Sequence, residues 1–273
     1  MRSVLCIWDV AAGAESVVLT VDQRIEAPNW DPDGETLLVN GGGRLFRVPL
    51  DAPALVSVET GFATKCNNDH GISPDGAWIA LSHHAGRGSE IYMMPAAGGV
   101  PVPVTSHAPS WWHGWSPEGK RLAYVAARGP GPIDVYTIGV GGGEETRLTF
   151  GEGHCDGPDF AADGARIFYN CDRTGHAQIW VMDADGGNQR QVFADDDVNW
   201  FPHPSPCGRY LVYLAYPPGT LGHPADLEVA LVLCDGDGLG GERIVEFVGG
   251  QGTINVPSWR QDGGAFAYVR CEA

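Results

Sequence analysis

Short apolar runs that alternate with polar positions recur along the whole chain. Examples are "WIALSHH" (78–84), "RLAYVAA" (121–127) and "YLVYLAY" (210–216), and each of them follows a turn that contains glycine. A period of two residues is typical of a β-strand with one side against a core. No segment shows a sustained helical period, and Asp-Gly or Gly-Gly pairs separate the runs. The pattern therefore predicts an all-β protein built from antiparallel hairpins.

The turns recur at a nearly constant interval. When segments such as "DHGISPDG" (69–76) and "WHGWSPEG" (112–119) are aligned on their last glycine, the intervals are 42 to 45 residues, with a final interval of 55. A period of about 40–45 residues with four short strands is typical of a propeller blade. The turn glycines are Gly34, Gly76, Gly119, Gly164, Gly208 and Gly263.

The two ends of the chain complement each other. The first residues contain the third and fourth strands of a unit, and the last residues contain its first and second strands. Joining them closes the ring and removes exposed sheet edges. We therefore expect one six-bladed β-propeller domain of four-stranded antiparallel blades over residues 1–273. The predicted blades are 26–62, 67–107, 110–151, 155–196, 199–249, and 253–273 together with 1–22.

The charge and hydropathy of the chain limit the kinds of partner that we expect. The net charge is −17 and the isoelectric point is about 4.7, so the overall field repels a phosphate backbone and excludes nucleic acid as the expected partner. No apolar run reaches the length of a transmembrane helix, so we expect no membrane insertion. The seven cysteines form no CxxC pair and the N-terminus does not resemble a signal peptide. These features predict reduced thiols and a cytoplasmic location.

The repeat grammar points to a known family. Segments such as "WSPEG", "QIWVMDADGG" and "TRLT" resemble the TolB-like, or PD40, β-propeller repeats over essentially the whole chain. The resemblance implies the propeller fold. TolB itself is a periplasmic protein-interaction component, and the repeat serves many roles, so the resemblance leaves the function open.

All nine histidines are predicted on one face of the ring. In a propeller the innermost strand of each blade lines the central channel, so residues where it begins lie at one channel mouth. Four histidines occur at or just before these positions in consecutive blades, and imidazoles near carboxylates suit Mn, Zn, Fe, Ni or Ca. The predicted ligands of a divalent metal cofactor are His70, His113, His154 and His203.

Other polar and aromatic residues surround these positions. The predicted catalytic residues are His70, His113, Asp69, Asp156 and Arg173. The predicted substrate-binding residues are Trp112, Trp200, Gln251 and Asn255. The alternatives are structural: a lone histidine often serves as a hydrogen-bonded core residue, the tryptophans as blade packing, and Arg173 in "NCDRTGH" as a brace between blades. The extra length around 216–228 is either a lid or a plain insertion.

Within related propellers the chain is distantly similar to the oligogalacturonate lyases, which implies channel-mouth histidines on a divalent metal. On that reading the protein is an enzyme: the metal polarises a carbohydrate-like ligand, a base removes a proton, and β-elimination follows. The competing interpretation is a non-catalytic, TolB-like scaffold for a protein or peptide. A third is a sugar-binding module without catalysis.

Overall fold

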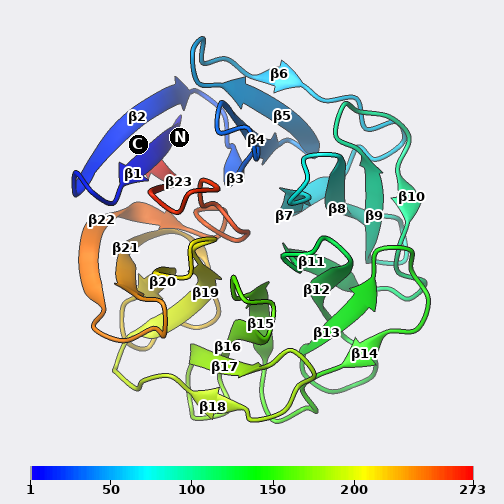
Figure 1. Cartoon of the computed structure of the whole chain (residues 1–273), viewed down its shortest axis with the longest axis vertical. Helices are drawn as coiled ribbons and strands as arrows, with labels where there is room; N and C mark the ends of the chain where they lie inside the picture. Colours follow the sequence, from blue (N-terminus) through cyan, green and yellow to red (C-terminus); the bar gives the residue numbers. More distant parts are fainter. Residues whose placement is uncertain (1, 273) are drawn as a thin grey trace.

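The computed structural model describes residues 2–272 and consists of six antiparallel sheets arranged around a central axis (Figure 1). Successive sheets follow the chain around the ring, and both ends of the chain lie in the same sheet (Figure 1). The predicted all-β, six-bladed propeller is thereby confirmed. Within residues 2–272 there is no helix with the length and apolar character needed to cross a membrane.

Five blades have four strands each. The first contains β3 (Glu26–Trp30), β4 (Thr36–Gly41), β5 (Arg44–Pro49) and β6 (Val56–Ser57). The second contains β7 (Cys66–Ile72), β8 (Trp78–His84), β9 (Ser89–Pro95) and β10 (Val102–Pro103). The third contains β11 (Ser110–Trp115), β12 (Arg121–Ala126), β13 (Asp134–Gly139) and β14 (Thr146–Arg147). The fourth contains β15 (Cys155–Phe160), β16 (Arg166–Cys171), β17 (Gln178–Asp183) and β18 (Arg190–Gln191). The fifth contains β19 (Val198–Pro204), β20 (Tyr210–Tyr216), β21 (Ala225–Asp235) and β22 (Glu242–Gly250).

The sixth blade joins the two ends of the chain, as predicted. It contains β23 (Ala265–Glu272), β1 (Arg2–Asp9) and β2 (Ala14–Val21), with β1 in the middle. Its innermost strand is reduced to a single bridge between Trp259 and Phe266, so this sheet has three regular strands where the repeat predicts four. Residues 1 and 273, which the prediction assigned to this blade, lie outside the described residues.

The core lies between the blades rather than at the axis. Apolar side chains that alternate along each strand interdigitate with those of the next blade. The contact between the sixth and first blades, which closes the ring, is an example. Leu5 and Ala267 of the sixth blade share one buried cluster with Ile25, which precedes β3, and with Leu37 of β4. The ring therefore depends on both ends of the chain.

The innermost strands are bulged near their beginnings. In the fourth blade Asp156 faces Asn170 and Asp159 faces Phe168, so β15 has one residue more than β16 over this stretch. Comparable irregularities occur in the innermost strands of the other four-stranded blades, β3, β7, β11 and β19. A bulge bends the strand and redirects side chains. The end of the channel where these strands begin is called the upper mouth below.

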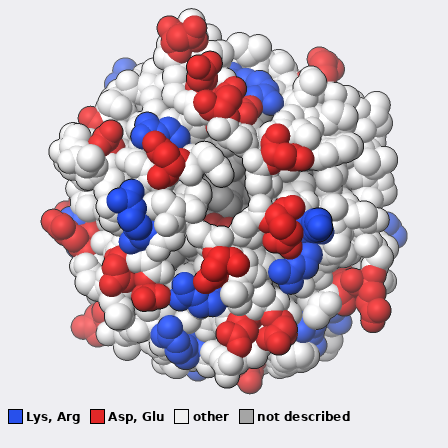
Figure 2. Space-filling view, viewed as in Figure 1, with Lys and Arg blue, Asp and Glu red and all other residues white. Residues whose placement is uncertain are grey.

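The opposite end of the channel, called the lower mouth below, is regular. There the amide of each turn glycine donates to the carbonyl three residues earlier, as from Gly34 to Asp31 (2.9 Å) and from Gly119 to Ser116 (2.8 Å). These glycines have a positive φ, which glycine adopts without steric cost because it has no Cβ atom. On the face drawn in Figure 2 acidic and basic side chains are scattered around a central hollow and the basic ones form no extended patch.

Candidate functional site

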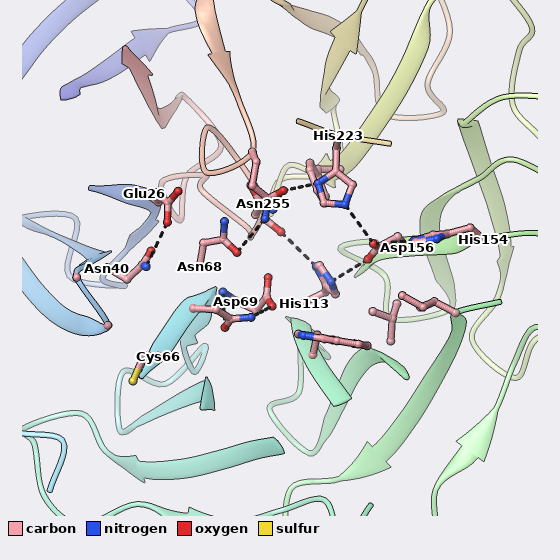
Figure 3. A pocket seen from close by; sticks show the side chains of 18 residues that line it. Glu26, Asn40, Cys66, Asn68, Asp69, His113, His154, Asp156, His223 and Asn255 are labelled. Atoms are coloured by element: carbon pink, nitrogen blue, oxygen red, sulfur yellow. Dashed lines mark hydrogen bonds and ion pairs between the residues drawn. The ribbon is translucent and has the colours of Figure 1, made fainter. Parts of the chain in front are cut away.

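A cavity of about 520 Å³ lies at the upper mouth (Figure 3). Its lining combines many polar side chains with apolar surface and comes from the blades and the loops between them. Among the described residues, none that lines it is lysine or arginine. The polar and aromatic residues that line it are Glu26, Asn40, Asn67, Asn68, Asp69, Trp111, His113, His154, Asp156, Phe201, His223, Gln251 and Asn255.

The strand bulges place several of these side chains. His113 lies between Trp112 and Gly114, where the register of β11 shifts against β12, and Asp69 lies in the corresponding stretch of β7. Gly157 has a positive φ of 57°, and Phe201 adopts a φ of 56°, which is uncommon for a bulky residue. Strained backbone of this kind is concentrated at functional sites because the surrounding structure must hold it.

Three histidines surround the carboxylate of Asp156 (Figure 3). Its Oδ1 lies 3.0 Å from Nε2 of His113, and its Oδ2 lies 3.3 Å from Nε2 of His154 and 3.9 Å from Nε2 of His223. The backbone amide of Gly157 also donates to Oδ1 (2.7 Å). Asp156 is therefore the centre of the cluster.

The contacts of both ring nitrogens of His113 favour a charged ring. Nδ1 faces the carbonyl oxygen of Asn255 at 3.2 Å, while Nε2 faces Asp156, so both ring nitrogens act as donors. Burial opposes the charge on His113, but the hydrogen bond and charge of Asp156 outweigh burial and raise its pKa. Burial likewise opposes ionisation of Asp156, but His113 and His154 lower the pKa of this carboxyl well below its usual range.

Asp69 behaves in the opposite way. Burial, together with the nearby charges of Asp156 and Glu26, raises the pKa of Asp69 to about 7, although His113 and Asn67 oppose the shift. Burial also raises the pKa of Glu26. The cavity thus contains one carboxylate that stays ionised and one carboxyl group that titrates near neutral pH.

Amide side chains complete the polar wall. Gln251 donates from Nε2 to Oδ1 of Asn68 (3.3 Å) and accepts at Oε1 from Nδ2 of Asn255 (3.1 Å). Asn40 donates to Glu26 over a long 3.5 Å contact, and the side-chain oxygen of Asn40 has no hydrogen-bond partner within residues 2–272. These amides offer both donors and acceptors to a ligand.

Of the four histidines predicted as metal ligands, the structure brings His113 and His154 to the cavity and leaves His70 and His203 outside it. His70 lies beyond the bulge of β7, where it pairs with Leu81, and is fully buried. Burial lowers its pKa to about 4. The two ring nitrogens of His203 lie 3.1 Å from Asp159 and 2.5 Å from the carbonyl oxygen of Ile254. The expected convergence of all four fails because the bulges shift the register differently in each blade.

Three other predicted site residues also lie outside this cavity. Trp112 is fully buried, and its ring occupies the space where a side chain on Gly71 would lie, so it packs in the wall and lines the lower mouth. Trp200 lines a neighbouring cavity, described below. Arg173 pairs with Glu152, in the linker before β15, at 2.5 Å and lies 4.3 Å over the ring of Trp180 in its own blade, so these contacts are local to the fourth blade. Asp69, Asp156, Gln251 and Asn255 do line the cavity.

His223 is the main site residue that sequence reasoning did not select. It lies in the loop between β20 and β21, and its ring contacts those of Trp200 (centroids 4.4 Å apart) and Phe201 (5.2 Å). The extra length of this blade was visible in the 55-residue interval. Only the folded loop shows that its histidine turns inward.

The arrangement does not fit a resident metal ion. Within the described part of the chain, no three or more histidine, cysteine or carboxylate side chains are grouped so as to hold one. His113 uses both nitrogens as donors, and a protonated nitrogen has no lone pair for a metal. His154 and His223 also direct their Nε2 atoms toward Asp156, so the carboxylate itself occupies the point at which the rings converge. The cluster is therefore an ion-paired histidine–carboxylate network.

The cysteines differ from the prediction at one pair. Cys155 and Cys171 face each other on β15 and β16 and form a disulfide, whereas five other described cysteines are free. The prediction of reduced thiols is wrong for this pair, because antiparallel pairing brings their Cβ atoms within bonding reach. Cys155 lies between His154 and Asp156, so the disulfide borders the site.

Comparison with known proteins agrees with the fold and the repeat. Residues 105–222 match the family model described as the TolB beta propeller domain. An uncharacterized protein, Atu1656 of Agrobacterium fabrum, is 46% identical over 272 residues, which is 99% of this chain and 92% of that protein. A solved structure from Agrobacterium tumefaciens, provisionally described as TolB, is 45% identical with a TM-score of 0.98, over 100% of this chain and 99% of the other.

The chain is thus a TolB-like β-propeller, and it belongs to the same family as these two Agrobacterium proteins. A more distant solved structure, an oligogalacturonate lyase in complex with manganese, is 16% identical with a TM-score of 0.59, over 90% of this chain and 74% of the other. That likeness concerns the fold alone.

Proposed function

We propose that the upper-mouth cavity binds a small, neutral, hydroxyl-rich ligand of the carbohydrate type, and that Asp69 and His113 take part in proton transfer to and from it. One observation carries the proposal. The cavity combines five amide side chains, three carboxyl groups and three histidines, and none of its described lining residues is lysine or arginine.

The chemistry of the wall favours hydroxyl groups. A hydroxyl group both donates and accepts, as do the amides of Asn68 and Gln251, whereas a carboxylate only accepts. A uronate carboxylate here would approach Glu26, Asp69 and Asp156, and His113 is already paired with Asp156. The cavity therefore suits a neutral sugar better than the acidic sugar named for the distant lyase.

Asp69 supplies the proton-transfer group. A pKa of about 7 divides it between base and acid at neutral pH, which is the range in which a general base works best. Where the ligand carries a carbonyl group, such as a ring ketone, the Asp69 carboxylate takes a proton from the adjacent carbon, and the positive charge of His113 stabilises the resulting enolate. The acid so formed returns the proton to a departing hydroxyl group, which leaves as water. This sequence is a β-elimination without a metal.

Calorimetric titration with neutral monosaccharides and with the matching uronic acids tests the proposal. We expect binding of a neutral sugar, weaker binding of its uronic acid, and no change when EDTA is added. Gln251→Ala should weaken binding at least tenfold. Gln261→Ala, at the lower mouth, is the matched control and should not change it. If no neutral sugar binds, the proposal is wrong. If a sugar is turned over, Asp69→Asn should abolish turnover while binding remains.

Family membership favours one alternative, a non-catalytic scaffold that binds a protein or peptide. TolB is the name given to the family model and to the solved relative that is 45% identical. This alternative predicts no heat of binding with any sugar, together with a protein partner whose capture depends on the rim of the upper mouth. The predicted cytoplasmic location stays a prediction, which the thiol titration below addresses.

A further inference from the structure

A second cavity, of about 560 Å³, adjoins the upper-mouth cavity and is called the side cavity below. Both cavities are lined by His154, His223 and Gln251. These three side chains therefore form the partition between two neighbouring compartments.

The two compartments differ in chemistry. The side cavity is walled largely by apolar side chains, including Val198, Trp200 and Leu221, with polar groups such as Asp172 and Thr220 among them. Leu221 is 90% exposed, more than any other large hydrophobic side chain in the described structure. Exposed apolar surface rimmed by polar residues marks interaction sites and ligand-binding grooves, and ligand pockets combine apolar walls with a few placed polar groups.

The loop that carries Leu221 is held at both ends. The hydroxyl of Tyr216 donates to the carbonyl of Pro224 (3.1 Å), and the amide of Gln251 donates to the same carbonyl (3.2 Å). His223 hydrogen-bonds to Gln251 and packs against Trp200. The partition is therefore fixed to the scaffold, while Leu221 stays at the open side of the loop.

On the basis of the proposed function, we propose that the side cavity binds an apolar substituent attached to the hydroxylated ligand of the upper-mouth cavity. The ligand class is then an aryl or alkyl glycoside: its sugar lies among the amides and carboxyl groups, its apolar aglycone lies against Leu221 and Trp200, and His223 contacts the junction. The adjacency of the two cavities, which share three lining residues, carries this inference.

Matched glycosides test it. Calorimetric titration compares the methyl and phenyl glycosides of the same neutral sugar, and we expect the phenyl glycoside to bind at least tenfold more tightly. Leu221→Ser should abolish that gain and leave the methyl glycoside unchanged, since an exposed side chain contributes little to folding. Leu239→Ser, 52% exposed on the distant β21–β22 turn, is the matched control. Equal affinity of the two glycosides, or a gain that survives Leu221→Ser, would overturn the inference.

Phenol alone separates this inference from the proposed function. In an NMR titration, phenol should shift the backbone amides of Gly219 to His223 in the wild-type protein and not in Leu221→Ser. If these shifts occur and no sugar binds, the side cavity takes an apolar group and the proposed function is wrong. If phenol shifts none of them, the side cavity is not an apolar subsite, whatever the sugars do.

Discussion

The two mouths of the channel are built from the same six repeats and differ in the side chains that line them. At the lower mouth a cavity of about 310 Å³ is lined by aromatic residues, prolines of the turns and a few polar residues, among them Trp30, Trp259, Asn29, Asp159 and Gln261. At the upper mouth the lining contains three histidines, three carboxyl groups and five amides. Of the described residues, no histidine lines the lower cavity.

The difference follows from how the backbone is paired. At the lower mouth each turn closes its own hydrogen bond and the strands stay in register. At the upper mouth the innermost strands bulge, which frees polar residues from the ladder and directs them into the channel. One end of each repeat therefore maintains the ring, and the other end is available for chemistry. The following predictions test this division, beginning with the largest expected effect.

Trp112→Ala should lower the free energy of unfolding by about 3–5 kcal/mol, since it empties a fully buried site against Gly71. Ligand binding at the upper mouth should remain, because Trp112 lines only the lower cavity. Urea denaturation and calorimetry measure the two effects. Trp78→Ala, at a side chain that is 41% exposed, is the control and should cost much less. Equal losses from the two variants would contradict a structural role for the lower mouth.

Asp69→Asn should stabilise the protein at pH 8 by on the order of 3 kcal/mol and have little effect at pH 4. Burial raises the pKa of Asp69 from 3.8 to about 7, so the folded state holds this proton more tightly than the unfolded chain. Stability is therefore lost as the pH rises from 3.8 to 7. Thermal melts at both pH values measure the effect.

Asp75→Asn, on a lower-mouth turn, is the control for that prediction. The hydrogen bond from Ser73 lowers the pKa of Asp75, so its ionised form is favoured in the fold and the substitution should not stabilise at pH 8. A stabilisation of similar size at both positions would mean that burial of Asp69 is not the cause.

The pKa values of His70 and His113 should be shifted in opposite directions from the ordinary histidine value of 6.5. Burial lowers the pKa of His70 to about 4, so it should stay neutral at pH 6. His113 should titrate above its ordinary value, since the ion pair with Asp156 outweighs burial and raises its pKa. NMR of selectively labelled histidine measures both. A neutral His113 at pH 6 would contradict this prediction and would leave one ring nitrogen with a lone pair that a metal ion can bind.

The smallest effect concerns the thiols. Under denaturing, non-reducing conditions, titration should find five free thiols, and after reduction seven, because Cys155 and Cys171 are paired. Seven before reduction would restore the prediction of reduced thiols made from the sequence and favour a cytoplasmic location. Loss of four of these five thiols, which corresponds to three disulfides in all, would point to an oxidising compartment.

Repeat period and alternation were sufficient to predict the six blades, the closing of the ring by both ends of the chain, and the presence of His113 and His154 at the upper mouth. These features follow from local rules, because a turn glycine needs a positive φ and a strand buries alternate residues. The positions of Asp69, Asp156, Gln251 and Asn255 at the channel mouth followed from the same topology.

Only the tertiary structure decided which side chains meet. His70 and His113 both lie six residues before a turn glycine, yet the first is buried in the wall and the second faces the cavity. The reason is the bulge, since one or two extra residues in a strand turn the following side chains to another face and leave almost no trace in the sequence pattern. His223 enters the site from a loop of the fifth blade, whereas His113 and Asp156 come from the third and fourth blades. Packing against Trp200 and Phe201 holds the ring of His223 in the site. Such contacts join residues far apart in the chain, so no local period determines them.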